Sequence, residues 1–148
     1  MSWFTWWFTH FRIRRLEWSL AVYTLAFGLF LMLPAVSFAT TGYHGVLGYL
    51  SEFNWGLLYC LTGVLHNVAL HVNGRASWTP FARLLTLFLN SQVFLAMAFA
   101  FAQSNPWGSG VFTYGAVGCL FCMIALVAAA EDCGREFKIW KEARDARG

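Results

Sequence analysis

Four long apolar stretches constrain this chain of 148 residues more than any other feature of its sequence. They cover residues 18–38, 55–72, 81–102 and 110–130. A helix needs about 20 apolar residues to cross the hydrocarbon core of a bilayer. Lipid offers no hydrogen-bond partner to a free backbone N–H or C=O group, so such stretches must be helical. The sequence therefore predicts an all-α, integral membrane four-helix bundle that forms a single membrane domain.

The composition supports this class and excludes others. Hydrophobic residues make up 59% of the chain and charged residues only 11%, whereas a soluble domain carries roughly 25% charged residues. Intrinsic disorder requires low hydrophobicity and is therefore excluded. The sequence has no P-loop, nucleotide-binding glycine loop or zinc-finger spacing, and we expect no nucleic-acid partner. The four cysteines lie in or just after apolar runs, which argues against a disulfide framework.

The basic residues orient the predicted spans. The loops at residues 39–54 and 103–109 contain no Lys or Arg, so all ten basic residues fall on one side of a four-span arrangement. Basic residues concentrate on the cytoplasmic side of membrane proteins. We therefore predict that both termini are cytoplasmic. The basic residues are Arg12, Arg14, Arg15, Arg75, Arg83, Arg135, Lys138, Lys141, Arg144 and Arg147.

The tryptophans mark the ends of the same spans. Indole rings prefer the headgroup boundary of a bilayer, where the ring is half in apolar surroundings and its N–H can bond. No Trp lies in the middle of a predicted span. We therefore expect seven tryptophans to act as interfacial anchors against the lipid bilayer, namely Trp3, Trp7, Trp18, Trp55, Trp78, Trp107 and Trp140.

The two ends of the chain have their own patterns. Residues 1–17 place an aromatic face before Arg14 and Arg15, which predicts an interfacial helix on the inner leaflet. Residues 131–148 hold five acidic and five basic residues and predict a charged cytoplasmic tail that continues the fourth helix; a docking handle is the alternative. The first stretch also resembles a secretory signal, and cleavage of residues 1–39 would leave three spans.

Several polar side chains lie inside the second and third spans. Intramembrane polar residues are costly and mark candidate functional sites. They could join helices by hydrogen bonds, line a polar path between the two spans, or bind a metal or haem. His66 and His71 are five residues apart, or about 140° out of register on a helix, so they cannot face one iron. We therefore expect no cofactor. The predicted cluster consists of His66, Asn67, His71, Asn90 and Gln92.

The fourth span carries small residues at spacings of three and four. Such a stripe lets another helix approach closely, either from within the chain or from a second copy. The predicted helix-packing groove consists of Gly115, Gly118, Cys119, Cys122, Ala125 and Ala129. Cys119 and Cys122 form a C-x-x-C pair, but its position in mid-membrane, away from charges that lower a thiol pKa, favours packing over redox chemistry.

The sequence shows no nucleophile–base–acid arrangement, and we expect a protein that is not an enzyme. Its short length, packed spans and charged tail at Arg135–Arg147 resemble the small helical membrane proteins that bacterial viruses encode, including holins. This resemblance implies a multi-pass protein of the bacterial inner (cytoplasmic) membrane that oligomerises there, with lesion formation or exclusion of a competitor as its effect. The leading hypothesis is a self-associating, permeabilising or envelope-modifying protein. The alternatives are an accessory subunit that docks into a larger membrane complex and a haem- or metal-binding electron carrier.

Overall fold

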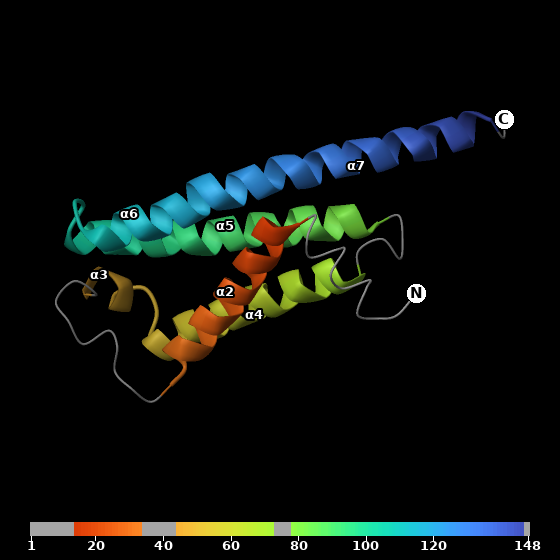
Figure 1. Ribbon diagram of the computed structural model, residues 1–148. Coiled ribbons are helices and arrows are strands. Elements are labelled where there is room, and N and C mark those ends of the chain that lie inside the picture. The colour runs from red at the N-terminus through yellow and green to blue at the C-terminus, as the bar shows by residue number, and fades with distance from the viewer. Residues whose placement is uncertain (1–13, 34–43, 73–77, 147–148) are drawn as a thin grey trace.

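The computed structural model describes residues 14–33, 44–72 and 78–146, and most of these residues are helical (Figure 1). The prediction of an all-α fold is confirmed for this part of the chain, in which no strand occurs. The elements are α2 (Arg15–Leu31), α3 (His44–Leu47), α4 (Glu52–Val72), α5 (Thr79–Ser104), α6 (Ser109–Gly115), η2 (Ala116–Phe121) and α7 (Cys122–Asp145).

Within the described residues, three helices are long and apolar enough to cross a membrane. They are α4, α5 and the continuous helix Ser109–Asp145, which α6, η2 and α7 form together. The described part of the first predicted span is α2, which has 17 residues and is not among the three. The rest of that span, residues 34–38, lies outside the described residues. An interfacial helix is predicted for residues 1–17, and of these residues 1–13 also lie outside the described residues.

The observed helix ends follow local sequence signals. Pro80 lies in the first turn of α5, where its missing N–H has no intrahelical acceptor to lose. Asn105 adopts an extended conformation and ends the same helix. The fourth span and the tail form one helix of 37 residues, about 55 Å long at 1.5 Å per residue. The expectation that the tail continues the fourth helix is therefore confirmed as far as Asp145.

The helices pack as two pairs, α2 against α4 and α5 against α6–α7, and α4 joins the pairs through α5 (Figure 1). Glycines set the distance between α2 and α4. A Cβ atom added at Gly28 would lie 2.5 Å from the backbone N of Cys60, and one at Gly63 would lie 2.6 Å from the backbone N of Leu25. The two helix backbones are therefore in contact at both glycines.

The predicted packing groove of the fourth span is filled by α5 of the same chain. Four of its six residues are buried: Gly118, Cys122, Ala125 and Ala129. Of the other two, Gly115 is half-buried and Cys119 is exposed.

The hydroxyl of Ser91 donates a 2.9 Å hydrogen bond to the Gly118 carbonyl, which lies within the π-helical segment η2. Insertion of a side chain into the hydrogen-bond ladder is an established cause of local helix distortion.

The tryptophans divide into two groups. Trp18 and Trp55 are buried, and the indole N–H of Trp55 donates to the Val46 carbonyl at 3.1 Å. Trp78, Trp107 and Trp140 are exposed, as anchors require. Trp3 and Trp7 lie outside the described residues. The indole rings of Trp18 and Trp55 pack inside the chain, and the interfacial position of the seven tryptophans stays a prediction.

Candidate functional site

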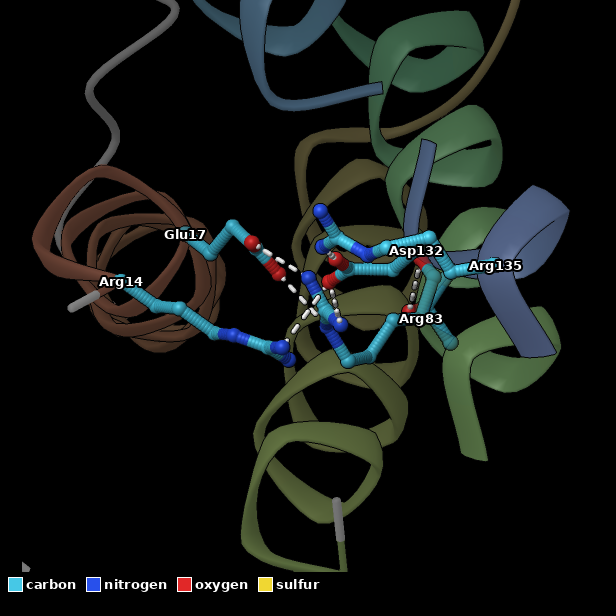
Figure 2. A network of polar contacts seen from close by, with 6 residues as sticks. Arg14, Glu17, Arg83, Asp132 and Arg135 are labelled. Atoms are coloured by element: carbon cyan, nitrogen blue, oxygen red, sulfur yellow. Dashed lines mark hydrogen bonds and ion pairs between the residues drawn. The ribbon is translucent and has the colours of Figure 1, made fainter. Parts of the chain in front are cut away.

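Charged side chains from three helices meet at one end of the bundle, which we call the charged end (Figure 2). Arg83 of α5 lies at its centre. Its Nε and Nη2 atoms donate to the two carboxylate oxygens of Glu17 at 2.9 and 2.6 Å, and its Nη1 donates to Asp132 Oδ2 at 2.8 Å. The Arg83 side chain is 1% exposed, that of Glu17 6% and that of Asp132 16%. The ion pairs therefore link α2, α5 and α7 almost out of contact with water.

Two further arginines flank Asp132. Arg14 Nη2 donates to Asp132 Oδ2 at 2.8 Å, and Arg135 pairs with Oδ1. Arg14 is 21% exposed and Arg135 is 71% exposed. Burial, and then the nearby Arg83 guanidinium, lower the pKa of Arg14 from its usual value. We call these residues, Arg14, Glu17, Arg83, Asp132 and Arg135, the ion-pair network; it holds three positive and two negative charges.

The burial of Arg83 makes the network a structural clamp. Desolvating an ion is costly, and the cost is offset only when hydrogen bonds satisfy the buried charge. Arg83 makes three charge-assisted bonds, two of them bidentate to Glu17, and such bonds are stronger than neutral ones. The partners are 66 and 49 residues away in the chain, so the network forms only when the helices are assembled.

Sequence reasoning missed this network. It placed Glu17 in the interfacial segment, Asp132 in the solvated tail and Arg83 among the topogenic basic residues. A usable signal was nevertheless present, since each of the three lies within two residues of a predicted span boundary on the same side of the membrane. An arginine inside a predicted span requires a partner, and three acids lie within two residues of a span boundary on that side: Glu17, Glu131 and Asp132.

A second polar contact joins α4 and α5 further into the bundle. The Nδ1 atom of His66 lies 2.7 Å from Nδ2 of Asn90, and both side chains are fully buried. Three buried atoms nearby in the α4–α5 core, His66 Nε2, Asn90 Oδ1 and the Tyr59 hydroxyl, have no hydrogen-bond partner among the described residues. The second and third predicted spans therefore do share a polar contact in their interior.

The rest of the predicted polar cluster does not join this pair. The Asn67 amide donates to the carbonyls of Ala21 at 3.0 Å and Gly63 at 2.8 Å, so it faces α2. Gln92 is exposed and His71 is half-buried at the end of α4. Within residues 14–33, 44–72 and 78–146, no group of three His, Cys, Asp or Glu side chains could hold a metal ion.

Two arrangements are thus candidates for function. The ion-pair network can hold three helices together and attract anions to its surplus positive charge. The His66–Asn90 pair presents an unsatisfied donor and acceptor inside the bundle. Comparison of the chain with protein-family models, curated proteins and solved structures finds no match.

Proposed function

We propose that the protein is a non-enzymatic, multi-pass protein of a bacterial inner membrane that self-associates and makes the membrane permeable, as holin-like proteins do. One observation carries the proposal, the open face of the last helix. Within the most apolar window of helix Ser109–Asp145, 22% of the residues are buried inside the chain, against 44% for α4 and 56% for α5. This helix therefore has the largest apolar face left for contacts outside the chain.

In this proposal, two copies associate through the open face of the last helix and not through the small-residue groove that the sequence predicts. Apart from the exposed Cys119, the predicted small-residue groove packs against α5 and leaves little room there for a second copy. The opposite face exposes Cys119, Leu120, Met123, Ile124 and Val127. Helices in lipid associate through close side-chain packing rather than through the hydrophobic effect. A second copy of the same helix is the partner that this surface fits.

The proposed permeability depends on the interior of the α4–α5 contact. His66 and Asn90 are both fully buried in the core between the helices. An opening between α4 and α5 would give water access to the unsatisfied His66 Nε2 and Asn90 Oδ1 atoms. In this proposal, self-association favours the open arrangement, and the polar pair lines the resulting path.

Dye uptake after induction in a bacterial host tests this function. We expect the wild-type protein to admit a normally excluded dye rapidly, and Asn90→Leu to reduce uptake to near background because it removes the polar wall of the path. Asn67→Leu is the matched control; its amide contacts α2, and uptake should persist. Intact membranes in cells that contain full-length wild-type protein would contradict the proposal.

Thiol cross-linking in membranes tests the self-association surface. Cys119 is exposed on the open face, whereas Cys122 is buried. A symmetric contact between two copies places Cys119 beside its counterpart, and we expect a short bifunctional thiol reagent to give covalent dimers. Cys119→Ser should abolish the dimer band, whereas Cys122→Ser should retain it. Cross-linked dimers that persist in Cys119→Ser, or wild-type protein that gives no cross-linked dimer, would contradict self-association through this surface.

A specific observation also favours a second function, docking into a larger membrane complex. An apolar groove of about 310 Å³ opens beside the charged end, lined by Trp78, Phe81, Glu136, Phe137 and Trp140. Beyond it, α7 extends past the other helices (Figure 1). A defined complex with another membrane protein, recovered in place of homo-oligomers, would favour an accessory subunit over the first function.

A further inference from the structure

Every carboxylate oxygen of the ion-pair network already accepts a hydrogen bond, whereas one of the network's donors has no partner among the described residues. Both Glu17 carboxylate oxygens accept from Arg83. Asp132 Oδ1 accepts from Arg135, and Oδ2 accepts from both Arg83 and Arg14. Arg14 Nη1 is buried and has no hydrogen-bond partner among the described residues. One N–H edge and one positive charge are therefore left over at the start of α2.

We propose that Arg14 and Arg15, at the start of α2, bind a phosphate group, namely the phosphodiester of an anionic phospholipid. Arg15 is exposed next to Arg14, and the described part of the chain shows no ion pair to it. Phosphate oxygens suit this arrangement, because a guanidinium presents a planar fork of donors that matches phosphate geometry.

The position of the two arginines favours a lipid as the source of the phosphate. Arg14 and Arg15 precede the first predicted span, at the depth where the positive-inside pattern places the cytoplasmic headgroups. The cytoplasmic leaflet is negatively charged and attracts basic residues at the membrane surface. Arg14 is one-fifth exposed and adjoins the exposed Arg15 in the chain, so a headgroup at the membrane surface can reach both side chains. The phosphate would then complete the hydrogen bonding of the ion-pair network.

Native mass spectrometry of the full-length protein with added phospholipid tests the site. Phosphatidylglycerol and phosphatidylcholine serve as anionic and neutral probes, and inorganic phosphate serves as the soluble probe. We expect wild-type protein to retain phosphatidylglycerol in preference to phosphatidylcholine. Arg15→Gln should weaken this preference about fivefold, given the usual worth of one basic residue at a membrane surface. Because Arg15 makes no ion pair within the network, this variant is expected to fold normally.

Controls separate a built site from general charge attraction. Lys141→Gln removes the same charge from the exposed tail and should leave the lipid preference unchanged. Arg14→Gln should lose at least as much preference as Arg15→Gln. If millimolar inorganic phosphate displaces the lipid and binds with the same dependence on both arginines, the site stands and its ligand is soluble. Equal retention of the two lipids, or an equal loss in Lys141→Gln, would overturn the proposal.

Discussion

Replacing Arg83 with leucine is expected to destabilise the protein by about 3–5 kcal/mol, the usual cost of removing one partner from a buried ion pair. Arg83 is 1% exposed and bonds both Glu17 and Asp132. The variant would leave two carboxylates facing each other without their shared cation. The free energy of unfolding, measured by titration with a denaturing detergent in mixed micelles, should show the loss. The amount of protein recovered from membranes should fall with it.

Two further variants test the cause of this loss. Arg135→Gln removes an arginine that also contacts Asp132 but is 71% exposed, and exposed pairs contribute about 0–1 kcal/mol. The triple variant Glu17→Gln, Arg83→Met and Asp132→Asn removes the three most buried charges of the network together. It should recover part of the stability lost in Arg83→Leu, since it leaves no unpaired carboxylate in the network. A network without structural importance would give Arg83→Leu a stability close to that of the wild type.

The helices were predictable because length and hydropathy decide them. The second, third and fourth predicted spans each coincide with an observed helix to within three residues at their starts, at Glu52, Thr79 and Ser109. The alternation of alanines at residues 96–102, which is typical of a strand, lies within α5. In lipid, a single helix satisfies its own backbone, so these elements need little information from the rest of the chain.

The site was predictable only in part, because its geometry depends on which helices become neighbours. His66 and Asn67 are adjacent in sequence and therefore point about 100° apart on a helix. That spacing predicts two different neighbours, but it does not say that α5 faces His66 and α2 faces Asn67. The small-residue stripe had the same ambiguity, since a second copy and α5 would fit it equally. Only the assembled bundle assigns it to α5.

The second large effect is expected at Gly63, where α2 crosses α4. A Cβ atom there would lie 2.6 Å from the backbone N and 2.8 Å from the Cα of Leu25. Backbone atoms cannot rotate away as a side chain can, so Gly63→Ala must separate the two helices. Overpacking of this kind costs typically 1–3 kcal/mol and occasionally more. We expect about 3 kcal/mol, measured by the same detergent titration.

Gly134 provides the matched control, because a Cβ atom there meets nothing within 4 Å. Gly134→Ala should be stabilising by up to about 1 kcal/mol, the difference in helix propensity between the two residues. The same substitution is thus expected to act in opposite directions at two helical positions.

This contrast also tests whether the first span is removed as a signal peptide. Without α2, Gly63 has no Leu25 to clash with, and Gly63→Ala would then stabilise the helix as Gly134→Ala does.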